Sequence, residues 1–307
     1  MKHLLGLNHL SKEEILEIFM LAEKLKNETH NGIEHHILKG KTLAMIFTKS
    51  STRTRVSFET GMYQLGGNPI FLSSGDIQLG RGETIEDTAK VLSRYVDGIM
   101  IRTYKQSDVE ELAVHGSVPV INGLTDLLHP CQVLADLFTM YEEFGALGGK
   151  KLAYVGDGNN MANSLLYGCS KIGVDISVAT PPGYEPNAGV VENARMFAAQ
   201  SGCRISIGHD PMEAVNGADT VYTDTWISMG MEDEKEKRIL DFAGFMVDSN
   251  LMSAAAPGAI FLHCLPAYRG FEVSEEVIDG SSSRVLDEAE NRLHVQKAVM
   301  AILMGGS

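Results

Sequence analysis

Cysteine is scarce in this chain, and acidic residues outnumber basic ones. The 307 residues contain four cysteines, namely Cys131, Cys169, Cys203 and Cys264. Because no two of them have the CxxC spacing, the sequence argues against a disulfide scaffold, a zinc ribbon and redox chemistry. The net charge of −14 argues against a nucleic-acid partner, which would require a basic surface. Any anion site in this chain must therefore be local and focused.

A long apolar run is also missing. The apolar stretch from Ile15 to Ala22 is interrupted by Glu17, and no basic segment leads into it. A membrane-spanning helix needs about 20 mainly apolar residues, and a secretory signal peptide begins with a basic segment. The sequence therefore predicts neither a membrane span nor a signal peptide, and its few cysteines favour a cytoplasmic location.

The chain does contain a repeated alternation of apolar strands and amphipathic helices. Its length suits two domains of about 150 residues each, and the glycine-rich segment 145–150 marks the expected boundary. Strands are expected at 42–47, 69–72, 98–102, 118–121, 151–155, 175–179, 220–224 and 259–263. Helices are expected at 12–27, 56–65, 83–95, 107–115, 129–144, 161–172, 188–200 and 288–304. The pattern predicts an α/β fold of two doubly wound parallel-sheet domains, with ligands at the carboxyl ends of the strands.

The segment STRTR, from Ser51 to Arg55, follows the first expected strand and precedes a helix. A helix start favours anions through its N–H groups and its dipole, and arginine offers a fork that matches phosphate oxygens. The segment therefore predicts a phosphate site, or alternatively a polar turn with solvated arginines. Arg102 ends another expected strand, so it should lie at the same edge of the sheet.

Two further motifs open expected helices. In HPCQ, His129 and Gln132 lie on one face of the first turn, where they could bind a carbonyl oxygen and an NH2 group. The alternative is an ordinary polar helix start. The motif GDGNN, from Gly156 to Asn160, stands where a dinucleotide could bind, but the third glycine of GxGxxG is missing. Its asparagines suit a small polar ligand better.

Three later segments carry acidic, basic and thiol groups. In DTWISMG, Asp224 and Ser228 could hold the ammonium and carboxylate of an amino acid, or the segment could be a loop around a buried tryptophan. The charge-dense stretch 231–238 is expected to be solvated. Cys264 could be a core residue, or a proton acceptor and ligand contact if its neighbours lower its pKa. Arg292 belongs to a charged helix, and could reach the site if that helix returns to the first domain.

The chain resembles the aspartate/ornithine carbamoyltransferase family over almost its whole length, through STRTR, HPCQ, DGNN, DTWISMG, HCLP and ENRLHVQKA in this order. The first two motifs are shared by both branches, whereas DTWISMG and HCLP resemble the ornithine branch. The resemblance implies carbamoyl transfer from carbamoyl phosphate to the δ-amine of L-ornithine, giving L-citrulline and phosphate, with no cofactor and no metal. The alternatives are a carbamoyltransferase for another amine, such as putrescine or a modified ornithine, a non-catalytic anion-binding protein, and an NAD-linked dehydrogenase.

The same resemblance implies roles for individual residues. Carbamoyl phosphate would be bound by Ser51, Thr52, Arg53, Thr54, Gln78, Arg102, His129, Gln132, Cys264, Leu265 and Arg292. Ornithine would be bound by Asn160, Asp224, Ser228 and Met229, and the catalytic residues would be Arg53, Arg102, His129 and Cys264. The family's architecture implies a carbamoyl-phosphate domain over 1–145 joined by helix 289–307, an ornithine domain over 146–288, and a cleft between them. It also implies a homotrimer or a multiple of trimers, in which a neighbouring subunit supplies Gln78.

Overall fold

The computed structural model describes residues 1–73, 75, 77, 82–227 and 232–306. Contacts between residues divide the chain into two compact units, Met1–Leu134 with Asn291–Ser307, and Ala135–Glu290. The division falls inside two helices, α5 (Pro130–Phe144) and α12 (Val285–Met304). The boundary expected at 145–150 comes just after α5 and stays a prediction. Within the described residues, the helices all fall short of the length and apolarity that a bilayer crossing requires.

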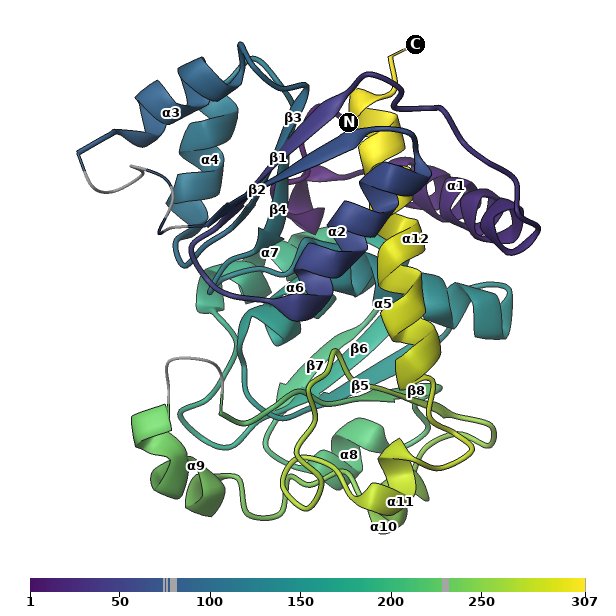
Figure 1. Cartoon of the computed structure of the whole chain (residues 1–307). Coiled ribbons are helices and arrows are strands. Elements are labelled where there is room, and N and C mark those ends of the chain that lie inside the picture. Colours follow the sequence, from purple (N-terminus) through teal and green to yellow (C-terminus); the bar gives the residue numbers. More distant parts are fainter. Residues whose placement is uncertain (74, 76, 78–81, 228–231, 307) are drawn as a thin grey trace. The chain divides into compact units, whose positions relative to one another are not determined.

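The first unit is built on a parallel sheet with the strand order β2-β1-β3-β4. The strands are β1 (Thr42–Phe47), β2 (Asn68–Ser73), β3 (Gly98–Arg102) and β4 (Val120–Leu124). The unit also contains η1 (Leu7–His9), α1 (Lys12–His30), α2 (Thr52–Gln64), α3 (Ile85–Leu92) and α4 (Gln106–His115). Figure 1 shows α3 and α4 side by side. Leu112 of α4 and Ala89 of α3 pack in one core with Ile46 and Ile99 of the sheet, so these strands are apolar along most of their length.

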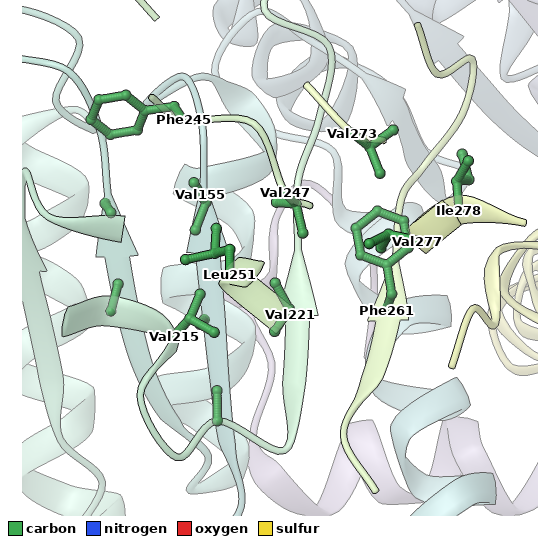
Figure 2. Packing of buried hydrophobic residues seen from close by; sticks show 14 of the residues in the cluster. Val155, Val215, Val221, Phe245, Val247, Leu251, Phe261, Val273, Val277 and Ile278 are labelled. Carbon is green, nitrogen blue, oxygen red and sulfur yellow. The ribbon is translucent and has the colours of Figure 1, made fainter. Parts of the chain in front are cut away.

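The second unit contains a parallel sheet with the strand order β7-β6-β5-β8-β9. The strands are β5 (Lys151–Val155), β6 (Asp175–Ala179), β7 (Ile205–Gly208), β8 (Thr220–Tyr222) and β9 (Ile260–Leu262). The helices are α6 (Asn160–Ile172), α7 (Ala188–Ser201), α8 (Pro211–Val215), η2 (Glu232–Glu234), α9 (Lys235–Asp241), α10 (Ser249–Met252) and α11 (Glu275–Ile278). Figure 2 shows Val155, Val221 and Phe261 of the sheet in one core cluster with Val215 and Leu251 from helices.

Two parallel sheets surrounded by helices confirm the predicted α/β fold class. The bounds of β1, β3, β5 and β6 agree with the expected strands. The pattern does not predict the helices α8 to α11, because helices of seven residues or fewer span too few turns to show a clear period. It also misses the short strand β7. The expected strand 118–121 is observed later, as β4, and α2 begins earlier than expected, at Thr52.

Candidate functional site

The first group of polar residues lies at the switch point of the sheet in the first unit. The strand order places β2 on one side of β1 and β3 on the other, and ligands bind outside the strand ends at such a point. Phe47, the last residue of β1, is paired in register with Arg102, the last residue of β3. The segment that leads from β1 into α2 therefore starts level with Arg102, and Thr48 N donates to the Arg102 carbonyl across 3.0 Å.

STRTR forms the start of α2 rather than a separate turn. Ser51 caps the helix, because its Oγ accepts a hydrogen bond of 3.2 Å from the N–H of Thr54. Thr52 and Arg53 are exposed, whereas Thr54 is buried. The arrangement leaves the positive end of the helix dipole beside the end of β3, where an anion would be stabilised.

The side chain of Thr54 joins two guanidinium groups. Its Oγ1 accepts hydrogen bonds of 3.4 Å from Arg102 and 3.4 Å from Arg292. Arg292 also donates to Oε1 of Gln132, which lies in the first turn of α5. The structure thus brings Arg292 of α12 beside residues from STRTR and HPCQ, within the same unit.

His129 is buried among positive charges. Burial lowers its pKa well below the usual value, and Arg292, Arg102, Arg53 and Lys49 add to this effect. The imidazole is therefore neutral near pH 7, and it can donate a hydrogen bond without adding a charge. We call Lys49, Arg53, Arg102 and Arg292 the cation cluster. Such a concentration of positive charge, in a chain with a net charge of −14, suits an anionic ligand.

Two basic residues near the start of α2 have contacts that the sequence does not predict. Arg55, the second arginine of STRTR, donates to Glu59 across 2.9 Å and stacks over the ring of Phe71. Lys49 belongs to the cation cluster although no motif marks it, and its Nζ lies 2.9 Å from Asp126. Its position directly after β1 is the signal that could have identified it, because it shares the strand end with STRTR.

The second group of polar residues lies at the switch point of the other sheet, between β5 and β8. Asp224 follows β8 and is buried. Its Oδ1 accepts from the Thr225 N–H across 2.7 Å and from Cys264 Sγ across 3.0 Å. Its Oδ2 accepts from Nδ2 of Asn159 across 2.8 Å. We call Asp224, Asn159 and Cys264 the Asp224 cluster.

The thiol of Cys264 has a raised pKa. Burial is the main cause, and the neighbouring Asp224 carboxylate adds to it through its charge and its hydrogen bond. A lowered pKa at Cys264, one of the two possibilities raised by the sequence, is therefore wrong. At neutral pH the group is a neutral thiol that donates a hydrogen bond.

Asn159, which the sequence did not single out, contacts Asp224. Asn159 is the N-cap of α6, and its Oδ1 accepts from the N–H groups of Met161 and Ala162. Its amide nitrogen then remains for Asp224, so one side chain fixes both the helix start and the carboxylate. Asn160 is the first residue of α6 and is half-buried. The preference of asparagine for N-cap positions was the available signal.

Gly158 explains why GDGNN departs from the dinucleotide pattern. A Cβ at this position would lie 2.4 Å from the main chain of Glu185 and of Pro186. The Gly158 N–H donates to the carbonyl of Tyr184 across 2.8 Å. In dinucleotide sites a glycine of this turn admits the pyrophosphate, whereas Gly158 admits the protein's own main chain.

Arg238 corrects the expectation for the stretch 231–238. Its side chain is buried, and it donates to Asp157 Oδ2 across 2.8 Å and to the Trp226 carbonyl across 2.9 Å. A third bond, of 2.9 Å, joins it to Glu234. The guanidinium thus connects the turn after β5 with the loop after β8, because both offer oxygen acceptors. Trp226 is buried, as the alternative interpretation of DTWISMG expects.

Gln78, Ser228 and Met229, to which the sequence assigned ligand-binding roles, lie outside the described residues. Within the second unit, Asp224, His263 and Cys264 offer possible metal-ligand atoms within 4.8 Å of one another. These atoms already serve other bonds, since Cys264 donates to Asp224 and His263 Nδ1 accepts from the N–H of Leu265.

Two family models match the chain. The model of the aspartate/ornithine carbamoyltransferase carbamoyl-P binding domain matches residues 2–142, and that of the Asp/Orn binding domain matches residues 148–303. The ornithine carbamoyltransferase of Caldicellulosiruptor saccharolyticus is 60% identical over 306 residues, which cover 100% of this chain and 99% of the relative. That of Methanothermobacter thermautotrophicus is 57% identical over 305 residues, or 99% of each. The solved ornithine carbamoyltransferase from Pyrococcus furiosus has a TM-score of 0.97 and 53% identity, covering 100% of this chain and 98% of that one.

Proposed function

This chain belongs to the aspartate/ornithine carbamoyltransferase family, and from that premise we propose that it transfers the carbamoyl group of carbamoyl phosphate to the δ-amine of L-ornithine. The products are L-citrulline and phosphate. The observation that carries this proposal is the cation cluster around the neutral His129, because the donor substrate combines a phosphate dianion with a carbonyl group. The names of the two relatives described above favour ornithine as the acceptor.

The donor substrate binds at the start of α2. Its phosphate is held by the N–H and hydroxyl groups of Ser51, Thr52 and Thr54 and by the guanidiniums of Arg53 and Arg102. His129, Thr54 and Arg102 polarise the carbonyl oxygen, while Gln132, Arg292 and the Cys264–Leu265 main chain orient the carbamoyl group. Negative charge develops on the carbonyl oxygen during attack, and prearranged donors of this kind are each worth about 3 to 4 kcal/mol in comparable sites.

The acceptor binds in the second unit. Asp224, Asn160, Ser228 and Met229 hold the α-amino and α-carboxylate groups of ornithine. The δ-amine has an ordinary pKa of about 10.4, like that of lysine, so it must lose a proton before it attacks. The amine nitrogen then bonds to the carbamoyl carbon and the C–O bond to phosphate breaks. One of the two protons of the neutral amine passes to the phosphate, and the other stays on the nitrogen of citrulline. Cys264 assists as a hydrogen-bond donor because its thiol stays protonated.

A direct assay tests this function. Formation of the carbamoylated acceptor is measured with carbamoyl phosphate and ornithine, whose product is citrulline, and with aspartate or putrescine in place of ornithine. We expect carbamoylation of ornithine only. A product from putrescine or aspartate, with none from ornithine, would instead assign the enzyme to another acceptor.

The family membership also supports a proposal for the assembly. Residues 1–145 with 289–307 bind carbamoyl phosphate, and residues 146–288 bind ornithine. The chain forms a homotrimer or a multiple of trimers in the cytoplasm, and each site receives Gln78 from a neighbouring subunit. Light scattering measures the mass of the assembly, which should equal that of three chains or of a multiple of three.

Mixed oligomers of Q78A and R102A chains test the shared site. They should regain activity, since one class of site would then contain both native residues, whereas mixtures that stay inactive would contradict a shared site.

A further inference from the structure

We propose that His263 is a positioning residue, which holds the main chain of Leu265 in the conformation that the active site uses. His263 directly precedes Cys264 and Leu265, whose main chain orients the carbamoyl group in the proposed reaction, so the inference rests on the proposed function. No step of that reaction uses the histidine itself. Its contacts nevertheless point to a defined task.

Leu265 has an unusual backbone conformation. Its φ angle is 55°, and among the described residues no other non-glycine residue has a positive φ. A side chain with a Cβ is disfavoured in this left-handed region, so the surrounding structure must hold it there. Held conformations of this kind concentrate at functional sites. The question is therefore which group holds Leu265.

His263 supplies the hydrogen bond that does so. The N–H of Leu265 donates to Nδ1 of His263 across 2.9 Å. Nδ1 can accept only when it carries no proton, so the neutral ring must have its proton on Nε2. Nε2 lies 3.4 Å from Oε1 of Glu272, and both side chains are buried. Nε2 has no hydrogen-bond partner among the described residues, but the carboxyl oxygen of Glu272 beside it favours the tautomer with the proton on Nε2, which leaves Nδ1 available to Leu265.

The ring is fixed by contacts from two sides. Oε1 of Glu272 accepts from the N–H of Tyr268 across 2.5 Å, which ties the carboxylate to the following loop. The main-chain N–H of His263 donates to Oε2 of the buried Glu288 across 2.9 Å. The other oxygen of Glu288 accepts from the hydroxyl of Tyr222 across 3.1 Å. Residue 263 is therefore held at its main chain by Glu288, and its ring lies between Leu265 and Glu272.

The alternative is that His263 carries a proton for Cys264. The hydrogen bonds argue against this role, because Sγ of Cys264 donates to Asp224 and Nδ1 of His263 is occupied by Leu265. A positioning role and a proton-carrying role differ in the atom that matters. Positioning requires only an acceptor at the place of Nδ1, whereas proton transfer requires a titratable ring.

Two substitutions of the full-length enzyme separate these roles. The amide of H263N places an oxygen where Nδ1 lies, whereas that of H263Q reaches toward Glu272 and leaves Leu265 without its acceptor. We expect kcat of H263N to stay within about threefold of the native value, and kcat of H263Q to fall about 100-fold, as a misplacement of about 1 Å can cause. Both variants lose the ring, so their melting temperatures should be similar. The E272Q variant retains an oxygen beside Nε2 and should keep the native pH profile of kcat.

Hydrogen exchange of the Leu265 amide, followed by NMR, tests the inference without turnover. The amide should be protected in the native protein and in H263N, and exchange faster in H263Q. Equal kcat losses in H263N and H263Q, or a pH profile shifted by E272Q, would overturn the positioning role. If H263Q does not fold, a folded H263N with a 100-fold lower kcat would also overturn it. Failure of the native enzyme to form citrulline would count against the proposed function, while the exchange result would still decide the inference.

Discussion

Sγ of Cys264 donates a hydrogen bond to Oδ1 of Asp224 across 3.0 Å, although Asp224 follows β8 and Cys264 follows β9, 40 residues later in the sequence. Because the thiol is a protonated donor, a serine should replace it better than an alanine. We expect C264S to retain at least tenfold more kcat than C264A, with the native pH profile. The measurement is kcat for citrulline formation between pH 6.5 and 9. A profile that loses its alkaline limb in C264S would show that the thiolate takes part.

Arg102 belongs to the cation cluster, and its loss should affect turnover more than folding. R102A removes one donor from the proposed oxyanion and phosphate site, so kcat should fall about 100- to 1,000-fold. The matched control is Arg94, an exposed arginine just beyond the end of α3. R94A should keep kcat within about twofold. Similar losses of kcat in both variants would indicate a general effect of net charge.

The burial of neutral His129 makes the stability of the first unit depend on pH. Its folded pKa is lowered, so below the ordinary value of about 6.5 the unfolded chain binds more protons than the folded one. Stability from this group is therefore complete above that pH and is lost as the pH falls. The loss is at most about 1.4 kcal/mol per pH unit. Urea unfolding of the native protein and of H129Q from pH 7.5 to 5.5 measures this effect. The native unfolding free energy should fall relative to that of H129Q as the pH is lowered, and a constant difference between the two would refute the linkage.

Asn159 both caps α6 and contacts Asp224, and two variants can separate these tasks. N159D retains a good capping oxygen but places a second carboxylate beside Oδ2 of Asp224. We expect N159D to raise KM for ornithine without changing that for carbamoyl phosphate. N159A should also lose about 1 kcal/mol of stability with the cap. Asn187 caps α7 in the same way without touching Asp224, so N187A should lose stability only.

Arg238 is expected to stabilise the second unit strongly. Removing one partner of a buried ion pair costs about 3 to 5 kcal/mol, so R238M should lower the unfolding free energy by about this amount. The loss should shrink at acidic pH, because burial already raises the pKa of Asp157 and a protonated carboxyl no longer needs the guanidinium. The neighbouring Lys237 is exposed, and K237M should change stability by less than about 0.5 kcal/mol. Chemical denaturation of the three proteins compares them, and equal stabilities would contradict the role of Arg238.

Local patterns account for most of the sheets and for few of the contacts between side chains. β1 and β3 have the expected bounds because their apolar runs are set by burial on both faces of a parallel sheet. Short elements such as α9 escape prediction, since one or two turns show no clear period. The burial of Arg238 escapes prediction for a different reason, because a charged segment is normally solvated and only the positions of its hydrogen-bond acceptors show that this arginine is not.

The sequence by itself determined the α/β class, the motifs and their positions after strands, because these depend on spacings of a few residues. Only the tertiary structure decided which groups meet. Arg292 reaches Thr54 and Gln132 because α12 returns to the first unit, and Asp224 meets Asn159 and Cys264 because β5, β8 and β9 are neighbours in the sheet. The protonated state of Cys264 follows from its burial and its contact with Asp224, because a pKa depends on burial and on nearby charges that a local sequence pattern does not contain.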